Sequence, residues 1–157
     1  MAKPNHLLFK IAKKWRPRGV TIRFRKDNYL IPAHATVLND GSKEMYVPFP
    51  NSREALFIFL HECAHHHLGH LKPGYAEPMW RMEYEAEHWA MTTMRSEGLH
   101  VPRSMIAEAK RYVAECACHD ASKGVEEQPP AVVRNWMTRR FKKKPKPCPN
   151  YRKPKAS

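Results

Sequence analysis

The segment His61-Glu62-Cys63-Ala64-His65 constrains this chain more than any other. It lies in an apolar run that indicates a helix, and residues four apart on a helix lie on one face, about one turn from each other. His61 and His65 can therefore reach the same metal ion. Glu62 lies beside them and can act as a general base toward water, which is the arrangement of a zinc hydrolase.

A third ligand is expected from the next predicted helix, which begins at Pro78 or Met79 and ends near Glu97. A catalytic zinc site uses three protein ligands and keeps one position open. Glu83 and Glu87 are four residues apart and share a face of this helix. We predict that Glu83 binds the metal and that Glu87 orients a ligating histidine through its free ring nitrogen. Glu85 is predicted to point elsewhere.

Other polar side chains near the motif are given secondary roles. His66 and His67 lie off the face shared by the two motif histidines, so we predict them at the surface or as outer partners. His70 is predicted to form a hydrogen bond near the site. Three side chains are candidates for a second donor to a developing oxyanion, and the sequence does not choose among them: Tyr75, Tyr84 and His88.

Hydrophobic periodicity predicts an α+β fold that is mostly helical after residue 52. A first helix is predicted over His6–Trp15, and three strands follow as a small antiparallel sheet. The strands are predicted over Val20–Arg25, Tyr29–Leu38 and Glu44–Phe49, with a turn at Lys26-Asp27-Asn28. The motif helix is predicted to begin with Asn51 as its cap and Glu54 in capping-box spacing. Two later helices are predicted over Arg103–His119 and Ala131–Phe141.

The net charge of +13 is concentrated at the two ends of the chain. Residues 1–26 and 128–157 carry +19 between them, whereas residues 27–127 carry −6. Basic ends of this kind favour contact with nucleic acid or an acidic partner, and a solubilising tail is an equally good interpretation. We predict one domain over residues 1–141 and a basic, proline-rich, disordered tail over residues 142–157.

The N-terminus and the hydropathy pattern predict a cytoplasmic protein that does not span a membrane. No apolar run is long enough to cross a bilayer, and the N-terminus lacks the apolar core of a signal peptide. The four cysteines are therefore expected as free thiols. Cys63 is predicted as a small core residue. Cys116, Cys118 and His119 lack the paired spacing of a zinc site, so a second metal site is disfavoured.

Residues 61–70, followed by Glu83-x-Glu85-Ala86 and Trp89-Ala90, resemble the ImmA/IrrE group of gluzincin metallopeptidases, which are common in phages and mobile elements. The likeness covers about residues 44–102. It implies a zincin-like helical core in which Zn²⁺ is bound by His61, His65 and Glu83, with Glu62 as the base. Glu87 stands where the family usually has asparagine or aspartate.

The expected function is hydrolysis of peptide bonds in a protein substrate by a zinc endopeptidase. The strand Glu44–Phe49 is expected to present an edge to an extended substrate. An alternative is a non-enzymatic, zinc-stabilised binder that holds nucleic acid or a host protein through the basic termini. A third possibility combines the two, as a protease localised on nucleic acid.

Overall fold

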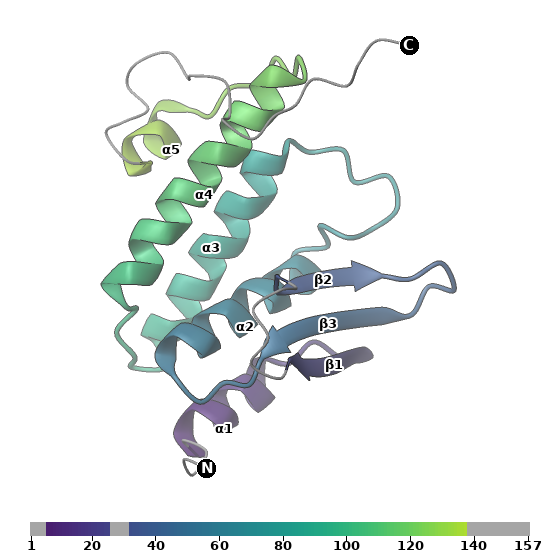
Figure 1. Ribbon diagram of the computed structural model, residues 1–157, viewed down its shortest axis with the longest axis vertical. Helices are drawn as coiled ribbons and strands as arrows, with labels where there is room; N and C mark the ends of the chain where they lie inside the picture. Colours follow the sequence, from purple (N-terminus) through teal and green to yellow (C-terminus); the bar gives the residue numbers. More distant parts are fainter. Residues whose placement is uncertain (1–5, 26–31, 138–157) are drawn as a thin grey trace. The chain divides into compact units, whose positions relative to one another are not determined.

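The computed structural model describes residues 6–25 and 32–137, and these residues form an α+β fold (Figure 1). The α+β class predicted from the periodicity is thus confirmed. In chain order the elements are α1 (His6–Trp15), β1 (Val20–Arg25), β2 (His34–Val37), β3 (Lys43–Pro48), α2 (Arg53–His67), α3 (Met79–Ser96), α4 (Arg103–Ser122) and α5 (Ala131–Trp136).

The three strands form a mixed sheet in the order β1-β3-β2. β2 pairs with β3 in antiparallel fashion, but β1 runs parallel to β3, so the predicted all-antiparallel sheet is wrong. Met45 and Val47 of β3 have no exposed surface, which explains why β3 takes the central position. Eight residues separate β1 from β2, more than a tight hairpin needs, so the two strands can lie apart and admit β3 between them.

The predicted bounds of the first elements agree with the structure at α1 and β1 and differ at the other strands. β2 is shorter than the predicted Tyr29–Leu38, of which residues 29–31 lie outside the described residues, as does the predicted turn at Lys26-Asp27-Asn28. β3 begins and ends one residue earlier than expected.

Helix α2 is capped by Ser52 and not by Asn51 as predicted. Ser52 has extended backbone angles, and its hydroxyl accepts a hydrogen bond of 3.1 Å from the backbone N–H of Ala55. Asn51 instead donates its backbone N–H to the carbonyl of Phe49 in the preceding turn. The helix is apolar on most sides and is buried along its length, with these side chains in the core: Leu56, Phe57, Phe59, Leu60, Cys63 and Ala64.

The described residues divide into two compact units. The first contains the elements from α1 to α2 together with residues 85–106, and the second contains residues 77–84 and the described residues after Ile106. The second unit has its own apolar core, which is formed by Trp80, Val113, Ala114, Cys116, Val133 and Met137. In this unit the buried Asp120 accepts a hydrogen bond of 2.9 Å from the backbone N–H of Trp80 and so caps the start of α3. The single domain predicted over residues 1–141 stays a prediction.

The C-terminal part of the chain is described only as far as Met137. α4 continues to Ser122, three residues beyond the predicted end, and α5 ends at Trp136. The predicted continuation of the last helix to Phe141 and the predicted tail over residues 142–157 lie outside the described residues. None of the described helices combines the length and the apolar character that crossing a bilayer requires.

Candidate metal centre

The two motif histidines converge on one face of α2, as the sequence predicts. Their Nε2 atoms lie 3.2 Å apart, and their rings are inclined at 74°. Two nitrogens bound at the usual zinc distance around a tetrahedral ion would lie about 3.3 Å from each other. The separation of His61 and His65 therefore fits two ligands of one ion.

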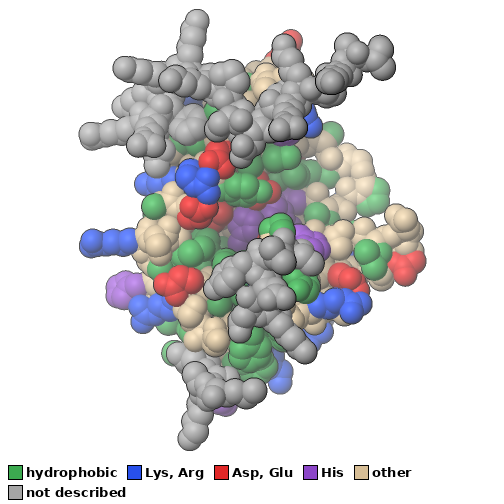
Figure 2. Space-filling view, in the orientation of Figure 1, with side chains coloured by type: hydrophobic (Ala, Val, Ile, Leu, Met, Phe, Trp, Pro, Cys, Tyr) green, Lys and Arg blue, Asp and Glu red, His purple; other side chains and the backbone are tan. Residues whose placement is uncertain are grey.

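Glu83 of α3 completes the cluster. One carboxylate oxygen of Glu83 and one ring nitrogen of each histidine lie within 4.8 Å of one another. Glu83 and His65 are buried, with 8% and 7% of their surface exposed, and a buried carboxylate beside two imidazoles is well suited to a cation. The three residues predicted as ligands are thus brought together, and the cluster could hold a metal ion. Figure 2 shows histidine side chains gathered next to acidic ones in the middle of this face.

His61 has a carboxylate behind its ring. Its Nδ1 lies 3.4 Å from Oε1 of Glu87, and the two side chains are 12% and 8% exposed. If Nε2 binds a metal, the ring proton resides on Nδ1 and faces this carboxylate, which fixes the tautomer and the orientation of the ring. Glu87 therefore lies where an outer partner of His61 is predicted.

His65 has a second histidine behind its ring. Its Nδ1 lies 3.1 Å from Nδ1 of His70, and Nε2 of His70 lies 3.1 Å from Oε2 of Glu85. With Nε2 of His65 on the metal side, the protons have one consistent order: His65 Nδ1–H donates to His70, and His70 Nε2–H donates to Glu85. His70 thus forms the predicted hydrogen bond near the site.

The end of α2 explains how His70 reaches back to His65. Gly69 has a φ of +78°, in the left-handed region that glycine adopts without strain. The backbone N–H of His70 then bonds to the carbonyl of His65 at 3.0 Å, and that of Leu68 bonds to Ala64 at 2.8 Å. This is a Schellman-type helix end. It turns the chain so that the His70 ring packs against the His65 ring at 5.1 Å.

Glu85 belongs to the site although its position in the helix predicts that it points elsewhere. It lies two positions from Glu87, on a different side of α3 from the face bearing Glu83 and Glu87. His70, a loop residue, contacts α3 on that other side. Helical spacing cannot indicate a contact with a loop residue.

His66 and His67 face away from the metal cluster and join α2 to its neighbours. Nε2 of His66 lies 3.3 Å from the carbonyl oxygen of Glu44 in β3, and burial lowers the pKa of this histidine. Nε2 of His67 lies 3.0 Å from the carbonyl oxygen of Trp15 in α1, and its ring stacks on Trp89. Both histidines therefore have structural contacts in the first unit.

The three candidates for an oxyanion donor have different surroundings. The Tyr75 ring lies 5.3 Å from the His70 ring, beside the histidines of the site. Tyr84 packs edge-on against Trp136 in the core of the second unit. His88 is partly buried, and this burial, followed by the charge of Arg95, lowers its pKa. Tyr75 thus contacts the histidine cluster, and the role of all three candidates stays a prediction.

The described cysteines are not part of the cluster. Cys63 has no exposed surface, and burial, followed by the charge of neighbouring Glu62, raises the pKa of its thiol. Cys116 lies in the core of the second unit, where burial likewise raises its thiol pKa. Both cysteines and Cys118 are free thiols, as expected, whereas Cys148 lies outside the described residues. Within residues 6–25 and 32–137, the only group suited to a metal is that of His61, His65 and Glu83.

The chain was compared with known proteins at three levels. No family model, no curated protein and no solved structure matches it. The resemblance to the ImmA/IrrE group therefore stays a prediction, and the case for a function rests on the residues of the site.

Proposed function

We propose that the chain is a zinc-dependent endopeptidase of the cytoplasm. The observation that supports this proposal is the cluster of two imidazoles and one carboxylate, with Glu62 next to the first histidine. Three protein ligands of this kind are typical of catalytic zinc sites, which keep a fourth position for water or substrate, whereas structural zinc sites are closed by four.

The proposed mechanism assigns each residue one task. A bound zinc ion would supply Lewis-acid chemistry, making water acidic near neutral pH and polarising a substrate carbonyl. Glu62 is buried and takes the proton from the attacking water, then delivers it to the leaving amine. Glu87 and His70 hold the two ligating histidines in the required tautomer.

The substrate is proposed to bind along β2. The strand Glu44–Phe49, which is predicted from the sequence to present this edge, corresponds to β3. β3 is the central strand and both of its edges are paired, so that prediction is wrong. β2 pairs with β3 on one side and is an edge strand of the sheet among the described residues. An extended peptide could add to this edge through backbone hydrogen bonds.

The substitution Glu62→Gln tests the proposal. Because it removes the base and leaves the ligands in place, peptide hydrolysis should fall by about 10²–10⁴-fold while bound zinc stays at one ion per chain. Hydrolysis is measured on a fluorescence-quenched peptide library and zinc by mass spectrometry. Glu54→Gln is the matched control, since Glu54 is an exposed residue near the start of the same helix.

Two outcomes would contradict the peptidase. One is normal hydrolysis by Glu62→Gln. The other is a wild-type chain that holds zinc, cleaves nothing and binds DNA with an affinity that falls steeply as salt rises. The second outcome would favour the zinc-stabilised binder that uses its basic termini.

A further inference from the structure

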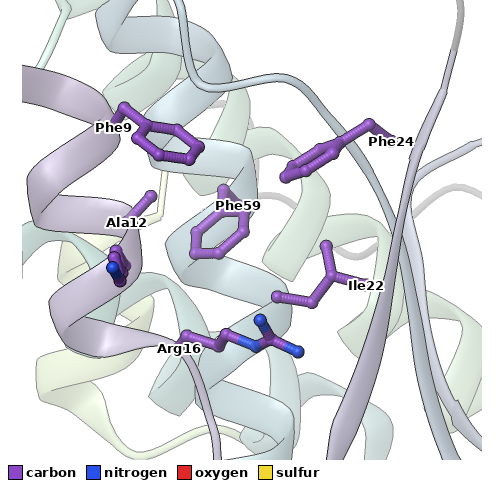
Figure 3. A pocket seen from close by; sticks show the side chains of 7 residues that line it. Phe9, Ala12, Arg16, Ile22, Phe24 and Phe59 are labelled. Atoms are coloured by element: carbon purple, nitrogen blue, oxygen red, sulfur yellow. The ribbon is translucent and has the colours of Figure 1, made fainter. Parts of the chain in front are cut away.

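A cavity in the first unit lies between α1, β1 and α2, and its lining residues do not include those of the metal cluster. It has a volume of about 240 Å³ and is lined by Phe9, Ala12, Lys13, Arg16, Ile22, Phe24 and Phe59. Figure 3 shows the rings of Phe9 and Phe24 on opposite sides of the opening, with Phe59 of α2 between and behind them. Phe59 precedes His61 by two residues, so the two side chains point to different sides of α2.

The walls of the cavity are aromatic and incompletely covered. Phe9 and Phe24 retain 39% and 41% of their surface exposed, although alternation along β1 would place Phe24 on the buried face. Phe49 fixes both rings: it stacks on Phe9 with a centroid distance of 5.6 Å and meets Phe24 edge-on at 5.1 Å. A rigid aromatic recess of this kind favours a further ring, which can pack edge-to-face.

The charged residues that line the cavity are basic, and none of its described lining residues is acidic. Lys13 lies in the last turn of α1 and Arg16 directly follows the helix. Arg16 donates to the carbonyl of Val20 at 3.2 Å, which holds its guanidinium at the cavity. Their neighbour Lys14 is paired with Glu97, whereas neither Lys13 nor Arg16 forms an ion pair among the described residues. The complementary occupant therefore joins an apolar group to a negative charge.

Size and topology narrow the occupant further. At about 240 Å³ the cavity is smaller than the usual pocket for a drug-sized ligand and suits a single large side chain. β1 is an edge strand among the described residues, so backbone groups next to the cavity can pair with an extended chain. The residues after 127 hold ten Lys or Arg and no acid, so the chain's own C-terminal segment is electrostatically unsuited to this rim.

We propose that this cavity is a docking site for an acidic peptide segment of a partner protein, which inserts one aromatic side chain between Phe9 and Phe24. The flanking carboxylates of the partner meet Lys13 and Arg16. This docking is independent of metal binding and of peptide hydrolysis, so it holds whether or not the chain is a peptidase.

A synthetic peptide tests the proposal on the full chain at physiological salt. The probe is a fluorescein-labelled nonapeptide with a central phenylalanine flanked by glutamates, and binding is followed by fluorescence anisotropy. A peptide with alanine in place of phenylalanine should bind about tenfold more weakly, because the aromatic anchor carries most of the affinity. Glutamine in place of the glutamates should also weaken binding, by about fivefold.

Substitutions in the chain locate the site. Phe24→Ala and Lys13→Glu should each lower the affinity for the phenylalanine peptide by about five- to tenfold. Thermal unfolding checks that both variants fold. Lys123→Glu makes the same change in net charge at an exposed position of the second unit and should change the affinity less than about twofold. Lys13→Glu is a surface change, so it tests the site even if Phe24→Ala alters the fold.

Three results would overturn the proposal. The first is no binding up to about 1 mM peptide. The second is an equal loss of peptide affinity in Lys123→Glu and Lys13→Glu, because the peptide would then be attracted only by the net charge of the chain. The third is a dimer in sedimentation experiments that Phe24→Ala dissociates, because the occupant would then be a second copy of the chain.

Discussion

The two ligating histidines of α2 are supported in different ways. His61 has a buried carboxylate, that of Glu87, 3.4 Å from its outer nitrogen. His65 has the imidazole ring of His70 in the same place, and the carboxylate of Glu85 comes only after it. The side chain of Glu85 is also 42% exposed, so water and salt screen its charge.

This difference implies that the two supports are unequal in strength. A buried charge next to the imidazole raises the basicity of the ligating nitrogen directly, because little solvent lies between them. A charge one ring further away and partly in water acts mainly by fixing the tautomer of His70. Metal affinity should therefore depend more on Glu87 than on His70, and more on His70 than on Glu85.

The largest effect is expected for Glu87. Glu87→Ala should weaken zinc binding by about 100-fold, since outer partners of ligating histidines commonly contribute this much. Glu87→Gln should weaken it by about tenfold, because an amide oxygen still faces the ring of His61 but the charge is lost. Zinc affinity is measured by competition with a chromophoric chelator. Glu54→Ala, which removes an exposed acid of α2, is the control. Affinity within twofold of wild type in Glu87→Ala would show that His61 needs no such support.

A smaller effect is expected for His70. His70→Phe keeps the packing of a ring but removes the acceptor for the proton of His65, and should weaken zinc binding by about 20-fold. His70→Asn restores an acceptor oxygen and should recover most of the affinity, to within about threefold of wild type. Long-range ¹⁵N NMR of the metal-free chain gives an independent signal, because His65 should lose its preference for the Nδ1–H tautomer in His70→Phe and not in His70→Asn. If His70→Phe instead binds zinc as tightly as wild type and His70→Asn binds it weakly, His70 acts through packing alone.

Local spacing explains why the metal cluster could be predicted and Glu85 could not. The i, i+4 pairs of α2 and α3 set the positions of His61, His65, Glu83 and Glu87 within one or two turns of helix. The contact of Glu85 depends on the chain reversal at Gly69, which brings a loop residue to α3. Periodicity describes each helix by itself and carries no information on such approaches.

The sheet and the helix cap show the same limit at the level of the fold. Hydrophobic periodicity in the sequence gave α1 and β1 their correct bounds, because turn-forming residues (Pro17, Gly19 and the segment after Arg25) flank the two patterns. The order of the strands in the sheet depends on which strand is buried in the central position. The alternation of polar and apolar residues along each strand does not specify that position. Serine and asparagine both cap helices well, so the sequence does not decide between Ser52 and the adjacent Asn51. In the structure Ser52 is the cap of α2, and the backbone N–H of Asn51 donates to the carbonyl of Phe49 in the preceding turn.

Substitution of Glu85 should have a weak effect on zinc affinity. It tests whether His70 supports His65 without help from the carboxylate behind it. Glu85→Ala should weaken zinc binding by only about threefold, because its partly exposed carboxylate is screened. Glu126→Ala removes an exposed acid of the second unit and serves as the control for net charge. A loss as large as that of Glu87→Ala would mean that the two histidines are supported equally after all, and the comparison between them would fail.

The smallest effect on metal affinity is expected for Ser52, although this residue stabilises the helix that carries both histidines. Its hydroxyl caps α2 at 3.1 Å from the Ala55 nitrogen, nine residues before His61, so Ser52→Ala should lower the free energy of unfolding by about 1 kcal/mol. Urea denaturation of the metal-free chain measures this loss. Zinc affinity should stay within about twofold of wild type, because fraying of the first turn leaves the last two turns packed. If Ser52→Ala instead weakens zinc binding as much as His70→Phe, general destabilisation of α2 would account for both results, and the separate support assigned to each histidine would lose its basis.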